Sequence, residues 1–270
     1  MIEVITMAGI PISRYRINNR FEIADDIQLG AMDWLVYVNY FGVCDVNVDK
    51  TLQRFPHNSV IVDNSQAFFS NPKKCLATIY SARKFFGVPD GGYLVTKWGI
   101  EIPKEEDDGS LGRCDHLLKR LAISPEAGYA DYKIAEDSLK MQYPKRMSQM
   151  TQRLLSSIDY ETVRARRRDN ARIIHEHLRS INLFQIDLDP DTAPLCYPFW
   201  NSKEGIRDYL IGKRIFIAQY WPEVAKCNDD GGIEQSIARE MSALPCDQRL
   251  NADSINRLLE CVWTVVGRKE

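Results

Sequence analysis

The sequence lacks long apolar runs, closely spaced cysteines and a secretion signal. No apolar run approaches the roughly 18 residues that a membrane-spanning helix needs, which argues against a membrane partner. The seven cysteines are never closer than 15 residues, so a C-x-x-C metal or redox motif is excluded and a disulfide framework is disfavoured. The start of the chain, Met1-Ile2-Glu3-Val4, lacks the basic region of a signal peptide. These absences predict a soluble protein of the cytoplasm.

An excess of charge and several enzyme motifs are also missing. The 35 Lys and Arg residues against 37 Asp and Glu leave a net charge of −2, so nothing points to a nucleic-acid partner. There is no G-x-S-x-G turn and no P-loop, which leaves serine hydrolases and P-loop NTPases without support. The four histidines have no metal-ligand spacing, and we expect no metal site.

Short apolar runs alternate with helix-compatible stretches in the first hundred residues. Runs at 34–38, 59–62, 77–80 and 93–96 indicate strands, with a short helix at 47–55. With 270 residues, of which 44% are hydrophobic, the chain can bury a sizeable core. The alternation predicts an α/β fold with a mainly parallel sheet, whose functional residues gather at the carboxyl ends of the strands.

From residue 111 to 181 the pattern becomes helical. Asp159 is expected to cap a long helix that extends to Ile181. The arginine run at 164–168 inside this helix has two interpretations. One is contact with phosphate, and the other, which we expect in a nearly neutral chain, is a solvated helix face.

A second α/β pattern follows the long helix and suggests a second domain. Strands are expected at 195–199 and 214–218, and helices at 203–211 and 252–266. We place the boundary near Ser156. The predicted division is a large domain, 1–155, and a small carboxyl-terminal domain, 156–270.

The order of parts around Lys84 is the order that a pyridoxal phosphate (PLP) enzyme needs. Asp63 ends an apolar strand, Lys84 follows about twenty residues later, and Gly91-Gly92 opens the next strand. Such an acid keeps the pyridine nitrogen of PLP protonated, so that the ring can withdraw electrons, and the lysine forms a Schiff base. A carboxylate at the end of a buried strand needs a partner, and the protonated nitrogen would be one.

The residues around Lys84 favour a neutral amine. Burial beside Phe85 and Phe86 and the positive charge of Arg83 both lower the pKa of a lysine. Taken alone, Lys84 has an equally simple interpretation as a surface lysine on an ordinary turn.

Two further polar residues are candidates for contact with the cofactor. Gln66 follows Asp63 by three residues and could reach the phenolic oxygen of the cofactor. It could as well make an ordinary loop hydrogen bond. Ser81 precedes Lys84 by three residues and can present a hydroxyl to a phosphate.

With these residues in place, the chain resembles the DegT/DnrJ/EryC1/StrS family. These are PLP-dependent aminotransferases of nucleotide-sugar and polysaccharide biosynthesis, with the fold type I of aspartate aminotransferase. Three segments carry the likeness: Asn-Tyr-Phe-Gly at 39–42, Val-Asp-Asn-Ser-Gln-Ala at 62–67, and the lysine loop with Gly-Gly at 81–92. The resemblance covers essentially the whole chain and implies a transaminase that acts on a keto-sugar nucleotide with an amino-acid donor.

The resemblance also implies roles for individual residues. Asp63 would pair with the pyridine nitrogen, Gln66 would contact the ring oxygen, and Lys84 would be the catalytic Schiff-base lysine. Ser81 would contact the phosphate. The candidates on the substrate side are Tyr220, Trp221 and Arg249. For the two aromatic residues, the alternative is packing inside the small domain.

Departures from the family pattern keep a second hypothesis open. The serine that the family commonly has five residues before the lysine is Ile79 here. Residues 1–9 match the end of a family helix and 12–17 the strand after it, so the phosphate-binding turn is expected upstream of this chain. The second hypothesis is therefore a non-catalytic remnant or structural subunit that binds PLP weakly or not at all. Because active sites of this fold lie at a subunit boundary, the resemblance also implies a homodimer.

Overall fold

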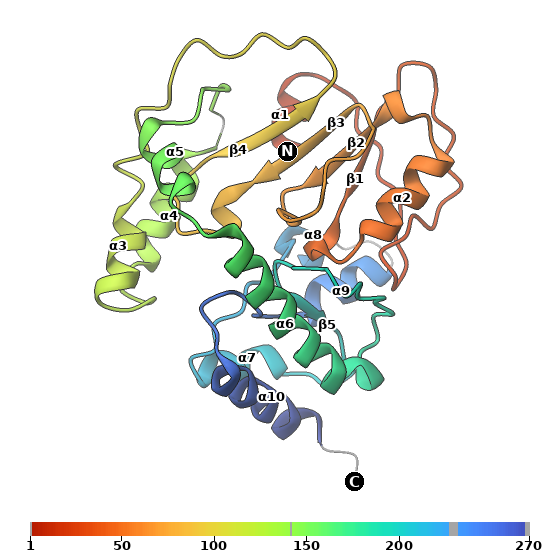
Figure 1. Cartoon of the computed structure of the whole chain (residues 1–270). Coiled ribbons are helices and arrows are strands. Elements are labelled where there is room, and N and C mark those ends of the chain that lie inside the picture. Colours follow the sequence, from red (N-terminus) through yellow and green to blue (C-terminus); the bar gives the residue numbers. More distant parts are fainter. Residues whose placement is uncertain (1, 141, 227–231, 268–270) are drawn as a thin grey trace.

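The computed structural model describes residues 2–140, 142–226 and 232–267, and its centre is a four-stranded sheet (Figure 1). The strands follow one another across the sheet in chain order, and the first three are parallel. The fourth runs antiparallel to the third. The strands are β1 (Leu35–Val38), β2 (Val60–Asn64), β3 (Ala77–Ser81) and β4 (Gly92–Thr96). The expected α/β fold with a mostly parallel sheet is confirmed.

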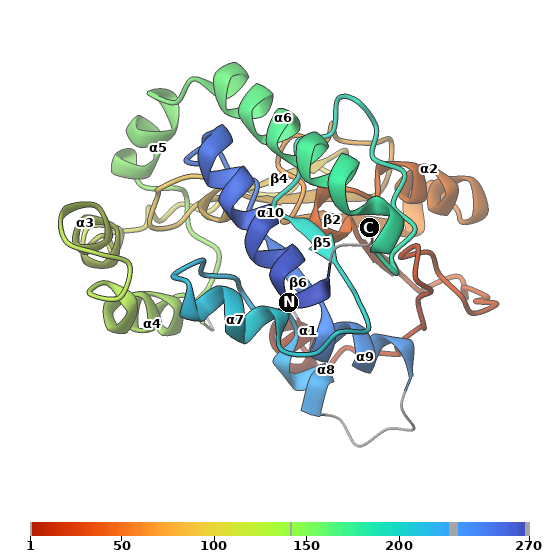
Figure 2. The same ribbon diagram turned by 90° about the horizontal axis from the view of Figure 1, so that it is seen from below.

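Helices surround this sheet, and a short ribbon of β5 (Tyr197–Phe199) and β6 (Ser242–Leu244) lies apart from it. Seen from below, α6 and α10 cross beneath the sheet (Figure 2). The α-helices are α1 (Ile2–Met7), α2 (Asp45–Arg54), α3 (Asp115–Ala122), α4 (Tyr129–Ser138), α5 (Gln149–Ser156), α6 (Tyr160–Leu178), α7 (Ile206–Gly212), α8 (Pro222–Lys226), α9 (Ile233–Glu240) and α10 (Ala252–Val266). Among the described residues, no helix is both long enough and apolar enough to cross a membrane.

The described residues also form four short 3-10 helices, and one of these holds Lys84. They are η1 (Tyr40–Gly42), η2 (His57–Ser59), η3 (Ala82–Lys84) and η4 (Arg179–Ile181). The expected long helix is present as α6 followed by η4. The carboxylate of Asp159 accepts a hydrogen bond from the backbone nitrogen of Thr162 at 3.0 Å, which confirms the predicted cap.

Two predicted strands are absent from the described residues. Residues 12–17 form only one bridge, Ile17 to Ile23, and 214–218 pair with nothing. Ile217 is buried and Ile215 partly buried in the cluster under α6 and α10, so the alternation reports burial rather than strand pairing. Arg214 has a φ of +60°, which turns the chain directly after α7. The expected helix end before residue 9 is present as α1, with Met1 outside the described residues.

Two large apolar clusters and one smaller one hold these elements together. The first joins β1, β2 and α2 to residues near the carboxyl end, such as Ile237 and Met241. The second lies among α6, α7, α10 and the β5–β6 ribbon. The third surrounds Phe85 and Phe86, directly after η3. The division into domains 1–155 and 156–270 stays a prediction.

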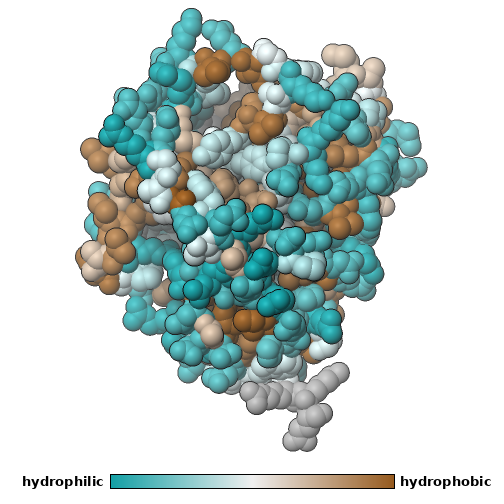
Figure 3. Space-filling view, in the orientation of Figure 1, coloured by the Kyte–Doolittle hydropathy of each residue, from teal (hydrophilic) through white to brown (hydrophobic). Residues whose placement is uncertain are grey.

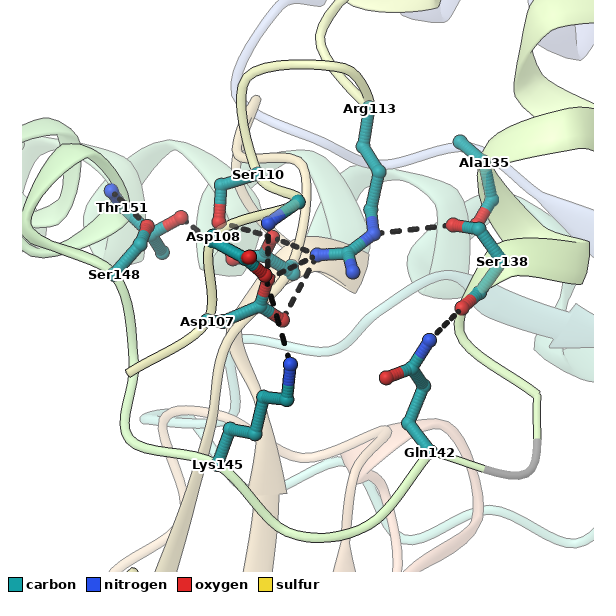
Figure 4. A network of polar contacts seen from close by, with 12 residues as sticks. Asp107, Asp108, Ser110, Arg113, Ala135, Ser138, Gln142, Lys145, Ser148 and Thr151 are labelled. Carbon is teal, nitrogen blue, oxygen red and sulfur yellow. Dashed lines mark hydrogen bonds and ion pairs between the residues drawn. The ribbon is translucent and has the colours of Figure 1, made fainter. Parts of the chain in front are cut away.

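A buried ionic network fixes the end of the loop that follows Lys84, at Asp90 (Figure 4). Asp90 accepts hydrogen bonds from the Arg113 guanidinium at 2.7 Å, from Ser110 at 2.6 Å and from Thr151 of α5 at 2.6 Å. The side chains of Asp90 and Arg113 are only 6% and 7% exposed. Asp107 is a second anion on the same guanidinium, at 2.9 Å. The network therefore fixes the start of β4 to α5 and to the loop before α3.

The glycine pair next to this network is required by close approach. Gly91 has a φ of +98°, and a Cβ there would lie 3.0 Å from the Thr151 methyl carbon and 3.1 Å from the Met147 methyl carbon. At Gly92 a Cβ would lie 2.9 Å from the carbonyl oxygen of Tyr80. Both positions therefore exclude a larger residue without local movement.

Asp90→Asn is expected to destabilise the protein by about 3 kcal/mol, because it leaves the buried Arg113 without its closest carboxylate. The free energy of unfolding in urea, followed by tryptophan fluorescence, measures this. The matched control is Asp131→Asn, which breaks a solvent-exposed pair with Lys119 and should change little. Equal effects of the two substitutions would contradict the importance of the buried network.

Candidate active site

Asp63, Ser65 and Lys84 meet at the carboxyl ends of β2 and β3. Asp63 lies next to the last residue of β2, and η3 begins where β3 ends. The Lys84 amine donates to the Ser65 hydroxyl at 3.2 Å, and the backbone nitrogen of Ser65 donates to the Asp63 carboxylate at 2.8 Å. Parallel strands bring their carboxyl ends to the same sheet edge, which is why residues 21 positions apart become neighbours.

Lys84 lies in surroundings that favour its neutral form. Burial by the surrounding protein lowers its pKa below the usual value for lysine, and the charge of Arg83 acts in the same direction. The carboxylates of Asp63 and Glu136 act in the opposite direction. The side chain still reaches solvent, so an amine of reduced basicity is open to a reactant.

Gln66 is buried, and the oxygen of its side-chain amide is hydrogen-bonded to the backbone. Its side-chain oxygen accepts from the backbone nitrogen of Phe41 at 2.9 Å. Phe41 has a φ of +56° in the turn after β1, and this bond holds the turn against the loop after β2. Within the described part of the chain, no hydrogen bond is found for the side-chain nitrogen of Gln66. That nitrogen remains able to donate to an oxygen of a bound group.

Ser81 stands at the position before η3, and its hydroxyl caps no backbone nitrogen there. Nor is any other hydrogen bond found for this hydroxyl within the described residues. Ile79 lies inside β3 opposite Asp63 and Leu94. A hydroxyl for a phosphate on this loop would therefore come from Ser81.

A buried arginine that we did not single out in the sequence holds the lysine loop in place. Arg167 of α6 is 2% exposed and donates to the carbonyl oxygens of Phe85 at 3.2 Å, Pro194 at 3.0 Å and Leu195 at 3.1 Å. Its guanidinium carbon lies 4.6 Å from the centre of the Phe85 ring. The expectation of a solvated arginine face is wrong for this residue, because it turns inward beneath the loop.

Ser65 and Glu136 were also missed. Ser65 lies inside the 62–67 segment, and its hydroxyl accepts the hydrogen bond of the Lys84 amine. Glu136 of α4 forms an ion pair with Arg83, the residue before Lys84. No local pattern could have joined Glu136 to a residue 53 positions earlier, whereas the position of Ser65 two residues after Asp63 was a usable signal.

Tyr220 and Trp221 pack against the turn after β1. The Tyr220 ring centre lies 5.1 Å from that of Phe41, and the Trp221 centre lies 5.6 Å from those of Phe41 and Tyr40. Burial raises the pKa of the Tyr220 phenol. Both rings therefore pack against residues 40 and 41 of the predicted large domain and not only inside the small domain, and they lie behind the backbone that binds Gln66.

Arg249 lies in a segment that contacts the lysine loop. Its guanidinium binds the Asp247 carboxylate through two nitrogens at 2.7 and 2.9 Å. That bonding raises the pKa of Arg249. The neighbouring Gln248 donates to the Phe85 carbonyl at 2.9 Å, so the segment abuts the residue directly after Lys84. Arg249 therefore stands beside the loop with its charge already matched by a carboxylate.

The chain has the fold of known sugar aminotransferases. No protein-family model and no curated protein matches the sequence. Among solved structures, a putative sugar aminotransferase from Streptococcus pneumoniae in its PLP form matches with a TM-score of 0.66 at 14% identity, over 98% of this chain and 77% of that one. A DegT DnrJ EryC1 StrS aminotransferase from Brucella abortus matches with a TM-score of 0.54 at 14% identity, over 87% and 65%.

A dehydratase shares the fold as well. The E coli GDP-4-keto-6-deoxy-D-mannose-3-dehydratase with bound hydrated PLP matches with a TM-score of 0.60 at 14% identity, over 96% of this chain and 75% of that one. This chain thus spans about two thirds to three quarters of the length of these proteins. The expected fold, that of the DegT/DnrJ/EryC1/StrS aminotransferases, is confirmed.

Replacing Arg167 with methionine should destabilise the protein by about 2 kcal/mol and loosen the lysine loop. The substitution keeps an apolar stem over Phe85 but removes the Arg167 hydrogen bonds to three carbonyl oxygens, of which that of Phe85 keeps the bond from Gln248. Hydrogen exchange of residues 82–92, together with urea unfolding, tests this. Arg166→Met, on the exposed side of the same helix, is the control. Unchanged exchange in the loop of the Arg167 variant would refute the role given to it.

Proposed function

We propose that the protein is a PLP-dependent aminotransferase of the cytoplasm that acts on a keto-sugar nucleotide, with an amino acid as the donor. The observation that supports this most is the cluster of Lys84, Ser65 and Asp63 at the carboxyl ends of the strands. A fold shared with sugar aminotransferases supports the reaction class. The choice of a nucleotide-linked sugar in polysaccharide or nucleotide-sugar biosynthesis follows the resemblance of the sequence.

The groups around Lys84 fit the chemistry of PLP. The Lys84 amine would hold the aldehyde carbon, the Asp63 carboxylate the pyridine nitrogen, and the Gln66 side-chain nitrogen the phenolic oxygen. The Ser81 hydroxyl, which has no described partner, would contribute to binding the phosphate. When bound, PLP supplies an electron-withdrawing ring that stabilises negative charge on the substrate carbon.

Lys84 is the residue to which we assign proton transfer. A lysine with a lowered pKa has a larger neutral fraction than an ordinary lysine, so its amine can accept a proton and return it. The bond to Ser65 orients the amine on the side of the loop that faces Asp63. Asp63 keeps a negative charge close by, which would stabilise a protonated ring nitrogen.

Tyr220, Trp221 and Arg249 are proposed to lie on the substrate side. The two aromatic rings form the wall behind the turn that holds Gln66. Arg249 offers a guanidinium beside the lysine loop, where an anionic part of the substrate could compete for it with Asp247. Retention of a lysine at position 84 favours the transaminase over the dehydratase branch, in which we expect histidine.

The second candidate is a non-catalytic protein of the same fold. Ile79 removes one hydroxyl from the lysine loop, and Ser81 is the remaining one. Charge-assisted hydrogen bonds to a phosphate contribute much of the binding energy of such a cofactor. On this alternative, PLP would bind weakly or not at all.

Borohydride reduction in the presence of PLP should attach the cofactor to Lys84, because this amine combines exposure with reduced basicity. Peptide mapping by mass spectrometry identifies the labelled lysine. Lys84→Ala should abolish the label, whereas Lys74→Ala, at an exposed lysine outside the site, should retain it. Label at another lysine, or none at micromolar PLP, would favour the non-catalytic alternative.

We propose further that the protein forms a homodimer through the outer face of α3 and α4. Apolar side chains gather there, seen at the left of Figure 3, and Leu121 is 86% exposed. β4 adds apolar residues with both faces open, and a hollow of about 470 Å³ lies between it and α5. Exposed apolar surface of this extent usually marks an association site.

Light scattering on the purified chain should give twice the 31.1 kDa mass of one chain. Leu121→Glu should shift the protein toward the monomer, because a charge would be buried at the contact. Met32→Glu, at an equally exposed residue away from these helices, is the control. A stable monomer of the unmodified chain at micromolar concentration would refute the dimer.

A further inference from the structure

The residue before Lys84 carries its own counterion, which comes from a distant helix. Two guanidinium nitrogens of Arg83 bind the two carboxylate oxygens of Glu136 in α4, and the longer of these contacts is 3.1 Å. Both side chains are about 30% exposed. The pair is therefore partly shielded from solvent, so its charges can act on nearby groups. It is not part of the apolar core.

The Ser65 hydroxyl contacts the Lys84 amine, and three charged groups from three parts of the chain act on the pKa of this amine. The Asp63 carboxylate comes from β2, the Ser65 hydroxyl from the following loop, the Arg83 guanidinium from η3, and the Glu136 carboxylate from α4. Positive charge at Arg83 opposes protonation of the amine. Negative charges at Asp63 and Glu136 favour it.

We propose that Arg83 and Glu136 are positioning residues that together set the protonation of Lys84. The positive charge of Arg83 favours the neutral form of the Lys84 amine. Glu136 weakens this effect, because its negative charge offsets that of Arg83 and its two hydrogen bonds fix the orientation of the Arg83 side chain. The inference deepens the proposed function, since it concerns the amine to which we assign the reaction. Through Glu136, helix α4 would then influence the protonation of Lys84, although α4 lies outside the sheet.

The two members of one ion pair should then have opposite effects. Glu136→Gln leaves Arg83 charged and unopposed, so Lys84 should become less basic. Arg83→Met removes the repulsion and leaves Glu136 as an extra attractive charge, so Lys84 should become more basic. A merely structural ion pair would give the same direction of change for both substitutions, because either one breaks the contact.

The experiment measures the reactivity of Lys84 without any cofactor. Trace amounts of acetic anhydride label lysines in proportion to their neutral fraction, and peptide mapping between pH 7 and 10 gives the titration of Lys84 alone. At pH 8 we expect labelling of Lys84 to rise about threefold in Glu136→Gln and to fall about threefold in Arg83→Met. Asp131→Asn, on another ion pair of α4, should leave it unchanged.

Opposite shifts of the Lys84 titration support the proposal, and shifts in one direction or no shift overturn it. Circular dichroism of each variant establishes that it is folded, and the double variant Arg83→Met with Glu136→Gln should titrate between the two single ones. This outcome is separable from that of the proposed function. Opposite shifts with no PLP attached to Lys84 would keep the electrostatic role and refute the transaminase.

Discussion

The fold around the candidate site depends on one buried cation, the Arg167 guanidinium. The described residues give it no carboxylate partner. Its two terminal nitrogens donate instead to three carbonyl oxygens, from Phe85, Pro194 and Leu195, while its buried Nε has no hydrogen-bond partner among the described residues. Burial lowers the pKa of Arg167, yet a guanidinium keeps its proton even so. Because a buried charge must keep its partners, the two backbone segments, at Phe85 and at 194–195, cannot move away from α6 without a large cost.

This constraint explains how a lysine on a short 3-10 turn is held in a defined place. Phe85, directly after Lys84, is bound through its carbonyl by both Arg167 and Gln248. At the other end of the loop, Asp90 ties the chain to α5 through Thr151. The segment that follows Lys84 is thus fixed at Phe85 and at Asp90, while the Lys84 amine directly before it keeps its access to solvent.

Much of the site could be predicted because it follows from strand geometry. An acid at the end of one parallel strand and a lysine after the next must come close, and Asp63 and Lys84 do. The inward turn of Arg167 could not be predicted, since it lies in a run of arginines that is typical of a solvated face. The 214–218 segment shows the same limit, because alternation of apolar residues reports burial and not hydrogen-bond pairing.

The site also shows a division between scaffold and reactive groups. Asp90 accepts three hydrogen bonds between 2.6 and 2.7 Å, and these bonds fix the loop. Lys84, by contrast, has one long bond of 3.2 Å to Ser65, and Gln66 uses only its oxygen. Leaving such groups partly unpaired costs stability, which a protein tolerates where a ligand completes the bonding. The polar atoms with unused hydrogen-bonding capacity therefore belong to the residues that we assign to the cofactor. The polar atoms with several partners belong to the residues that hold this site in place.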